Sequence, residues 1–284
     1  MTDSAPVRTR RVEMPCQMYD VLLPEPLPPD LNRSAMDANL AAAREALDAL
    51  NGAKARVGIA GEEAATSCRL DGLDVTAEQL ASFLETGDMP ENVSADDLRE
   101  TKGYLDTLSS IRERVGADGD PITLRLLREV HRQLLPSERG RGKQPGDFRR
   151  QQTWVGGSSP VDADFVPPRP DDIMDVMGPL ERFVNGVPEE LPSLLTAALA
   201  YAQLHMTQPF LTANGRLTRL LVQMILTARG VLDDSVLPLS IAVEVHQEAH
   251  DEALRRIRTQ GDWDGWIRFF AGRVTDAVTR AGGF

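Results

Sequence analysis

Residues 208–219 read Gln-Pro-Phe-Leu-Thr-Ala-Asn-Gly-Arg-Leu-Thr-Arg and decide the fold. An apolar helix ends before this segment, a short loop follows, and a second helix is predicted to start at Asn214 and Gly215. We expect Asn214 to cap the second helix, and Gly215 to let an anion approach the unpaired N–H groups at its start. Arg216 and Arg219 can each hold phosphate oxygens through two hydrogen bonds. On spacing alone, a solvated helix start with two surface arginines explains the pattern equally well.

Helix-start signals on both sides of this segment predict an all-α protein. Thr76 and Gln79 form a capping box, and Thr123 opens a helix with apolar residues on one face. Pro192 stands in the first turn of the apolar helix that runs to about His205. Further helices are predicted at residues 34–51, 94–116, 170–184, 214–229, 243–259 and 263–281.

The exception to the helical pattern is the stretch at residues 136–170, which is rich in Gly, Arg, Pro and Ser. Its strand-like piece ends in two glycines and predicts a short β-hairpin flap, formed by Thr153, Trp154, Val155 and Gly156. A proline-rich arm at residues 22–31 is expected to be extended. We divide the chain into an N-terminal arm and helical region, residues 1–117, and a core domain with C-terminal helices, residues 118–284.

Composition and charge exclude several classes of protein. The chain has 284 residues and a formal net charge of -12, which argues against binding to nucleic acid or anionic lipid, because both require a basic surface. Two cysteines are too few for a disulfide scaffold. The first residues lack the apolar core of a signal peptide, and no apolar stretch approaches the roughly 20 residues that span a bilayer. We therefore expect a cytoplasmic protein with no nucleic-acid or membrane partner.

Residues 208–219 resemble the signature of Fic-domain proteins, His-Pro-Phe-x-Asp/Glu-Gly-Asn-Gly-Arg-x-x-Arg. The resemblance extends, in the right order, to segments similar to those around the family's flap and in its C-terminal helix, at residues 139–149, 152–156, 165–168 and 261–270. It implies a Fic-fold helical bundle with a short β-hairpin flap and an N-terminal helical region.

The resemblance implies a protein adenylyltransferase that uses ATP and Mg²⁺. In Fic enzymes the loop histidine is the general base that deprotonates a target hydroxyl, and an acidic loop residue holds Mg²⁺ against the phosphates. In this chain Gln208 takes the histidine position, and a neutral amide cannot accept a proton near pH 7. Thr212 replaces the acidic residue with a neutral hydroxyl, and Ala213 replaces a loop glycine. We therefore expect a degenerate site without a protein-held metal, which argues against ATP and Mg²⁺ as cofactors.

A second motif, Ser67-x-x-x-Asp71-Gly72, resembles the family's inhibitory helix motif, Ser/Thr-x-x-x-Glu-Gly. In relatives that glutamate pairs with the second loop arginine and blocks a productive ATP pose, so the resemblance assigns Arg219 as the partner of Asp71. The aspartate is one methylene shorter than a glutamate, which predicts either a looser contact than in inhibited relatives or a shift of the helix that carries it. A plain Asp–Arg bridge that ties two helices together is the alternative.

Other polar residues near the loop leave alternatives open. Many relatives help to enclose adenine with two tyrosines, and the resemblance places His250 and Asp251 at these base-pocket positions. His205 lies three residues before Gln208 and can share its helix face, which makes it a candidate for a displaced base. A hydrogen-bonded structural histidine is the commoner case at such a position. We interpret His131 as a packing or surface residue.

These observations support three functions. The first is a pseudoenzyme that binds a nucleotide, another phosphorylated or anionic ligand, or a protein partner under its flap. The second is a repurposed enzyme of small-molecule metabolism in which Gln208 orients the substrate. The third is weak nucleotidyl or phosphoryl transfer, as by a protein adenylyltransferase, since positioning and charge carry much of such reactions. The sequence leaves open the ligand, whether catalysis remains, and the oligomeric state, including a homodimer.

Overall fold

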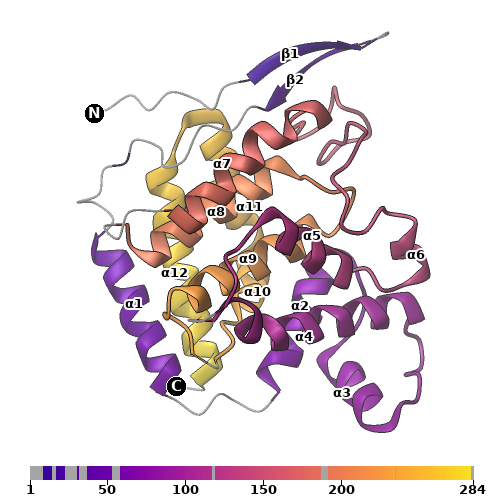
Figure 1. Cartoon of the computed structure of the whole chain (residues 1–284), viewed down its shortest axis with the longest axis vertical. Helices are drawn as coiled ribbons and strands as arrows, with labels where there is room; N and C mark the ends of the chain where they lie inside the picture. Colours follow the sequence, from indigo (N-terminus) through magenta and orange to yellow (C-terminus); the bar gives the residue numbers. More distant parts are fainter. Residues whose placement is uncertain are drawn as a thin grey trace.

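The computed structural model describes residues 9–14, 17–22, 31, 37–52, 58–116, 119–186, 191–233 and 235–282. Helices dominate this part of the chain and confirm the all-α prediction (Figure 1). They are α1 (Asp37–Gly52), α2 (Ile59–Leu70), α3 (Ala77–Thr86), α4 (Ala95–Val115), α5 (Leu124–Gln133), α6 (Glu138–Arg141), the 3₁₀ helix η2 (Pro170–Asp172), α7 (Ile173–Gly186), α8 (Ser193–Thr207), α9 (Asn214–Ala228), α10 (Leu239–Val245), α11 (Gln247–Gln260) and α12 (Trp263–Gly282).

Two strands that were not predicted precede the helices. β1 (Thr9–Met14) and β2 (Gln17–Leu22) pair antiparallel with each other and form a small sheet of their own. Most of the proline-rich arm at residues 22–31, together with the helix-start signal at Ser34, lies outside the described residues.

Local capping explains the helix starts that the sequence predicts. The Thr76 N–H donates to the Gln79 side chain at 2.8 Å, and the Gln79 N–H donates to the Thr76 hydroxyl at 3.2 Å, so the capping box is confirmed. The Thr123 hydroxyl accepts from the Leu126 N–H at the start of α5. α5 therefore begins where expected, which fixes the position of His131 near its end.

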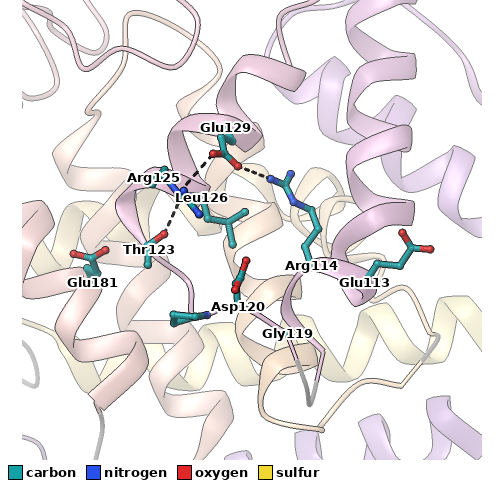
Figure 2. A pocket seen from close by; sticks show the side chains of 10 residues that line it. Glu113, Arg114, Gly119, Asp120, Thr123, Arg125, Leu126, Glu129 and Glu181 are labelled. Carbon is teal, nitrogen blue, oxygen red and sulfur yellow. Dashed lines mark hydrogen bonds and ion pairs between the residues drawn. The ribbon is translucent and has the colours of Figure 1, made fainter.

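A hollow of about 660 Å³ lies where α4 ends and α5 begins (Figure 2). Arg114 of α4 and Glu129 of α5 form an ion pair of 3.0 Å on its wall. Its lining contains none of the residues that the sequence singles out for function. The residues of the predicted site meet instead at a smaller cavity, described below.

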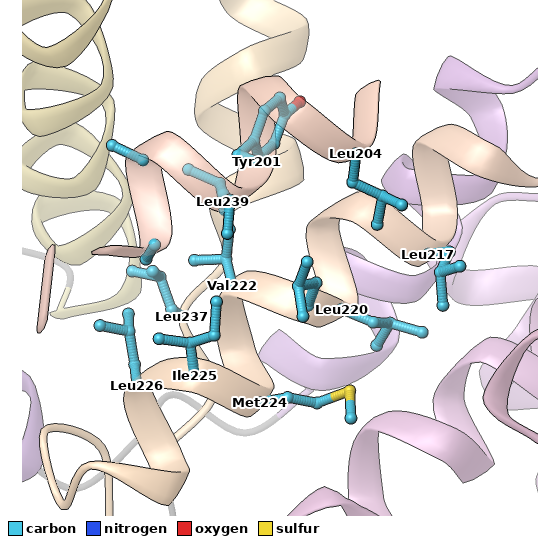
Figure 3. Packing of buried hydrophobic residues seen from close by; sticks show 14 of the residues in the cluster. Tyr201, Leu204, Leu217, Leu220, Val222, Met224, Ile225, Leu226, Leu237 and Leu239 are labelled. Atoms are coloured by element: carbon cyan, nitrogen blue, oxygen red, sulfur yellow. The ribbon is translucent and has the colours of Figure 1, made fainter. Parts of the chain in front are cut away.

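The centre of the molecule is the pair of helices α8 and α9. Nearly every residue of both is buried, as Figure 3 shows for Leu204 of α8 and for Leu217, Leu220 and Val222 of α9. A helix that is buried on all sides belongs to the core of a protein. Residues 208–213 join the two helices, so this short loop is anchored at both ends in the core.

The N-terminal helices complete the core around this pair. α1 packs along α12, and both α2 and α4 pack against α9. Leu47, Leu98 and Leu220 belong to one hydrophobic cluster, although the first two precede residue 117 and the third follows it. The division into residues 1–117 and 118–284 stays a proposal, and it separates two regions that share a core. Within the described residues, every helix is too short or too polar to cross a lipid bilayer.

Candidate functional site

The loop between α8 and α9 has two residues in the left-handed region of backbone conformation. Gln208, which ends α8, has φ 44° and ψ 57°, and Ala213, which precedes α9, has φ 57° and ψ 16°. For a residue with a Cβ this conformation costs about 1–2 kcal/mol relative to the right-handed helix. The prediction that Ala213 stands where a glycine is favoured is therefore confirmed.

Asn214 does not cap α9, so that prediction is wrong. Its Oδ1 accepts from the Phe210 N–H at 3.0 Å, and its Nδ2 donates to the Phe210 carbonyl at 2.9 Å. Asn214 is already the first helical residue and Ala213 takes the cap position, so the side chain turns back across the loop. Asn214 therefore fixes the shape of the loop and leaves the first N–H groups of α9 for another acceptor.

His131 of α5 binds to the loop between α8 and α9 and holds it in place. The local sequence around His131 does not reveal this role. Its Nδ1 accepts from the Gly146 N–H at 2.8 Å, so Nε2 carries the proton and donates to the Thr212 carbonyl at 3.1 Å. The ring stacks on Phe210 with centroids 3.8 Å apart. Burial lowers the pKa of His131 to about 4, so the imidazole is neutral near pH 7. His131 is a packing residue, as predicted, and also a hydrogen-bonded brace.

Arg149 is a second brace that sequence reasoning missed. Its guanidinium donates to the carbonyls of Gln208 at 2.8 Å and Gln151 at 3.2 Å, and also to that of Pro168. Burial lowers its pKa to about 10, which leaves it charged at pH 7. A buried arginine that binds carbonyls holds the end of α8 and the segment after the flap in one place. The only signal in the sequence was its position within the segment at residues 139–149 that resembles the family.

A carboxylate of the chain itself occupies the start of α9. Asp71, just after α2, accepts from Arg219 Nη2 at 2.8 Å and from Arg216 Nε at 3.1 Å. Its Oδ2 also lies 3.4 Å from the Arg216 backbone N, and a Cβ built on Gly215 would lie 2.6 Å from its Oδ1. Ser67 completes the contact, because its hydroxyl and carbonyl accept from Arg219 at 2.7 and 2.6 Å. The Asp71–Arg219 pair is present, and it fills the place expected for an external anion.

The shorter aspartate reaches its partner without a lengthened contact. The 2.8 Å separation of Asp71 and Arg219 is that of an ordinary charge-assisted hydrogen bond. Gly72 follows with φ 84°, a conformation that glycine adopts readily, and the chain leaves α2 directly behind the carboxylate. The inhibitory-like motif Ser67-x-x-x-Asp71-Gly72 is thus assembled against α9, whether it serves as a latch or as a bridge between helices.

Glu100 of α4 is the third functional candidate that the sequence did not reveal. Its carboxylate accepts from Arg216 Nη1 at 2.9 Å, from the Ser137 hydroxyl at 2.6 Å and from Arg139 at 3.1 Å. The side chains of Glu100 and Arg216 are only 3% and 2% exposed. Since α4 carries several other charged residues and the partner lies 116 positions away, no local pattern distinguishes Glu100.

The positions of the family's base and metal ligand hold neutral groups. The Gln208 Nε2 donates to the His205 carbonyl at 2.7 Å, which turns the amide back toward the end of α8. Thr212 presents a hydroxyl, and its carbonyl is already bonded to His131. Among the described residues there is no group of three His, Cys, Asp or Glu side chains that could hold a metal ion. The residues present therefore do not fit a protein-held Mg²⁺ ion.

Two histidines and an aspartate, His205, His250 and Asp251, lie near the loop and line the same cavity. His250 Nδ1 lies 2.8 Å from Asp251 Oδ1, so it carries the proton, and Nε2 accepts from the Tyr201 hydroxyl at 2.8 Å. Both nitrogens of His250 are occupied, which leaves none for a ligand. His205 packs against this ring, with centroids 5.8 Å apart, and burial holds its pKa well below the ordinary value. A neutral His205 of lowered basicity is a poor base, and its displaced-base role stays a prediction.

The loop, the Asp71 turn and α11 enclose a cavity of about 300 Å³, at the lower end of the usual range for ligand pockets. Most of the predicted site residues line it, namely Asp71, His205, Gln208, Thr212, Ala213, Asn214, Gly215, Arg219, His250 and Asp251. Ser67, Gly72, Arg216 and the flap residues are not part of its wall. Of the two arginines predicted to hold phosphate, only Arg219 therefore faces the cavity.

The flap does not form the regular two-stranded hairpin that its sequence predicts. Val155 pairs antiparallel with Phe165, while the neighbouring residues 152–154 and 156 of the expected strand are not paired in a sheet. Trp154 is 42% exposed, while Thr153 is half-buried and Gly156 turns the chain with φ 72°. The Phe165 ring lies 6.3 Å from the His205 ring, so the base of the flap contacts a residue of the cavity wall.

Residues 121–226, which include α8, the loop and most of α9, match the Fic/DOC family. The chain carries a Fic domain. A Fic family protein from Desulfovibrio desulfuricans has the same fold, with a TM-score of 0.72 over 90% of this chain and 76% of that one, at 19% identity. Fic-1 from C. elegans aligns over 88% of this chain and 73% of that one, with a TM-score of 0.69 and 18% identity.

Curated relatives match the Fic-domain protein over most of its length. "Protein adenylyltransferase Fic" of Aedes aegypti is 30% identical over 210 residues, which are 72% of this chain and 38% of the relative. The protein of the same name from Drosophila grimshawi is 29% identical over 238 residues, 80% of this chain and 45% of the relative. The chain thus spans less than half the length of these relatives.

Proposed function

We propose that this Fic-domain protein binds a nucleotide or another phosphate-bearing ligand at the start of α9 and does not carry out ordinary AMP transfer. The observation that carries the proposal is the neutral side chain at the base position, where Gln208 donates to the His205 carbonyl. Loss of a general base lowers a rate by about 10²–10⁴-fold. Thr212 adds to the loss, because it offers no carboxylate to a metal ion.

The phosphate-binding half of the site supports ligand binding. The backbone N–H of Arg216 and the guanidinium of Arg219 converge on the carboxylate of Asp71, which is itself an anion. Unpaired N–H groups and the helix dipole favour negative charge at this position. A phosphate group fits the same donors once Asp71 has moved away, so the ligand and Asp71 compete.

A protein adenylyltransferase is the second candidate. Two observations favour it: the relatives that carry this name, and the Asp71–Arg219 contact, which resembles the inhibitory contact of the family. In this case a hydroxyl-bearing protein target binds under the flap near the exposed Trp154. The third reading, a repurposed enzyme of small-molecule metabolism, uses the same cavity with Gln208 as a substrate-orienting amide.

The test measures transfer of labelled AMP from ATP, with Mg²⁺ or Mn²⁺, to the protein itself and to proteins of a cell lysate. We expect background transfer by the wild-type chain. The triple variant Gln208→His, Thr212→Asp, Asp71→Gly restores base and metal ligand and removes the competing carboxylate. We expect its transfer to exceed the sum of the single changes, because base and metal ligand act as a unit.

The control is Arg219→Ala in the triple variant, which keeps the base and removes the phosphate contact. Strong transfer by the wild-type chain, abolished by Arg219→Ala, would establish the adenylyltransferase instead. A folded triple variant as inactive as the wild type would show that the rest of the pocket no longer accepts ATP.

A further inference from the structure

We propose that the hairpin of β1 and β2 is a dimerisation element: β1 pairs edge to edge with β1 of a second copy of this chain, which gives a sheet of four strands. The inference goes beyond the proposed function, because the cavity at the start of α9 is lined by residues between Leu70 and Asp251. The hairpin precedes all of them in the sequence and is a separate surface.

The hairpin lacks the neighbours that such a small sheet needs. β1 and β2 form a sheet of two strands, so each presents one edge that pairs with no other strand among the described residues. Each strand packs extensively only against the other. Figure 1 shows both strands beyond the helices, with β1 as the outer one in this view. A hairpin of two strands is at best marginally stable in water, whereas a sheet of three or more strands can be stable. A further strand would therefore stabilise it.

Pairing of β1 with β1 gives a closed assembly. The two edges are identical, so a two-fold axis relates the copies and the contact is complete in a dimer. Pairing of β1 with β2 of another copy would leave a matching edge at each end and would continue from molecule to molecule. In the dimer β2 becomes the outer strand, and its charged residue Asp20 disfavours further pairing.

The charges along β1 select one register. Directly opposite residues of an antiparallel pair alternate between hydrogen-bonded and non-hydrogen-bonded pairs, so a two-fold axis must pass through a residue that is opposite its own copy. An axis at Arg10, Arg11 or Glu13 would place like charges opposite each other. An axis at Val12 places Arg11 opposite Glu13 of the second copy, and this pair occurs twice in the dimer. Opposite charges at directly opposite positions stabilise a sheet, and like charges destabilise it.

The register within the hairpin extends this pattern across the dimer. Arg11 is already opposite Asp20 of β2 in the same chain. In the proposed sheet the position of Arg11 therefore stands between Asp20 on one side and Glu13 of the second copy on the other. The edge of β2 offers no comparable pairing with itself, because Asp20 is the one charged residue of that strand. The second copy is thus expected at β1.

The test follows the self-association of the full chain by sedimentation velocity over a wide concentration range. We expect a monomer–dimer equilibrium for the wild type. Glu13→Arg places two cations opposite each other at both pairs and is expected to weaken the dimer at least about tenfold, as is Arg11→Glu. The control is Arg10→Glu, which makes the same change in net charge at a position opposite Met14. It is expected to alter the dimer affinity by less than about twofold.

Mixing the two charge variants supplies a readout that mere disruption of the hairpin would not give. In a mixed pair of Glu13→Arg and Arg11→Glu, both opposed positions again carry opposite charges. We expect a heterodimer with an affinity near that of the wild type, although each variant alone stays monomeric at the same concentration.

A disulfide tests the register directly. The axis brings the two Val12 positions to a Cα separation of about 4.5–5.5 Å, which is within the range that a disulfide bridges. In a Cys16→Ser background, where the remaining Cys68 is buried, Val12→Cys is expected to form a covalent dimer on oxidation. Arg10→Cys is the matched control and is expected to form little.

Three results would overturn the proposal. A wild-type chain that is monomeric at every concentration would refute dimerisation. Dimers that neither charge variant weakens would use another surface of the molecule. Failure of the two charge variants to form a heterodimer, or equal cross-linking of Val12→Cys and Arg10→Cys, would refute the pairing of β1 with β1 in this register.

Discussion

At the scale of single residues, two buried groups give the protein opposite responses to pH. Glu63 of α2 accepts from the Ser240 N–H at 2.9 Å, and burial raises its pKa to about 7. Between pH 4.5 and 7 the unfolded chain ionises this carboxyl while the folded chain keeps it protonated, so stability falls as pH rises. His131, with a pKa near 4, acts in reverse, because between pH 6.5 and 4 only the unfolded chain gains its proton. Each pKa shift changes the free energy of unfolding by about 3 kcal/mol across its pH range. Because the two changes have opposite signs and their pH ranges overlap, they largely cancel.

The substitution Glu63→Gln is expected to reveal the rise of stability with pH that His131 causes and that Glu63 offsets in the wild type. The amide can still accept from Ser240, and the hydroxyls of Tyr104 and Ser240 can reverse to accept from its NH₂ group. With the carboxyl removed, only the His131 trend remains, so the free energy of unfolding should rise by about 2 kcal/mol from pH 5 to pH 7, whereas that of the wild type stays nearly level. Urea unfolding at both pH values measures this, with the exposed Glu45→Gln as control. Parallel profiles for Glu63→Gln and wild type would contradict it.

Single residues also show which contacts of the candidate site can be predicted from the sequence. The pairing of Asp71 with Arg219 follows from a motif, since both residues stand in recognisable local patterns. The pairing of Arg216 with Glu100 could not be predicted, because it depends on how α4 packs against α9. Asn214 was assigned to the cap because it is a good capping residue, but the left-handed Ala213 shifts the helix start by one position.

At the scale of elements, helices with side-chain caps were predictable and the small β-elements were not. Thr76 and Thr123 determine helix starts through neighbours three residues away, so the information is local. The pairing of β1 with β2 depends on contacts between strands, and charged residues such as Arg10, Arg11 and Asp20 obscure their alternation. The flap lies between these cases, because its turn is visible in the sequence, but Val155 is the only residue of the expected strand 152–156 that pairs, with Phe165.

Arg258 of α11 is expected to stabilise the flap through its contact with Phe165. The Arg258 guanidinium lies 4.3 Å from the centroid of the Phe165 ring, a contact worth about 0.5–1 kcal/mol. Arg258→Met keeps apolar bulk and removes the charge, so proteinase K should cut residues 156–163 about two to five times faster. Arg255→Met is the matched control, because Arg255 pairs with Glu252 on the exposed side of the same helix. Equal cleavage of both variants would contradict the role of Arg258.

At the scale of the whole molecule, the shared core predicts one cooperative unit. α2 and α4, from the N-terminal region, pack against α9 of the Fic domain, and buried apolar residues such as Ile59 of α2 and Leu98 of α4 belong to one cluster with those of α9. We expect urea unfolding followed by far-UV circular dichroism and by tryptophan fluorescence to give a single coincident transition. The buried Trp263 and Trp266 report on the C-terminal half of the chain. Two separated transitions would instead support independent regions at residues 1–117 and 118–284.

Under the proposed function, Asp71 is a competitor for the phosphate-bearing ligand that is tethered to the site by the chain itself. Because the competitor is part of the same molecule, dilution cannot remove it, and its occupancy is independent of protein concentration. An external phosphate is bound only by the fraction of molecules in which Asp71 has left. If that fraction were about 1%, the apparent dissociation constant would be about 100 times the intrinsic one. A weak measured affinity would then describe the equilibrium of the Asp71 turn rather than the quality of the anion site.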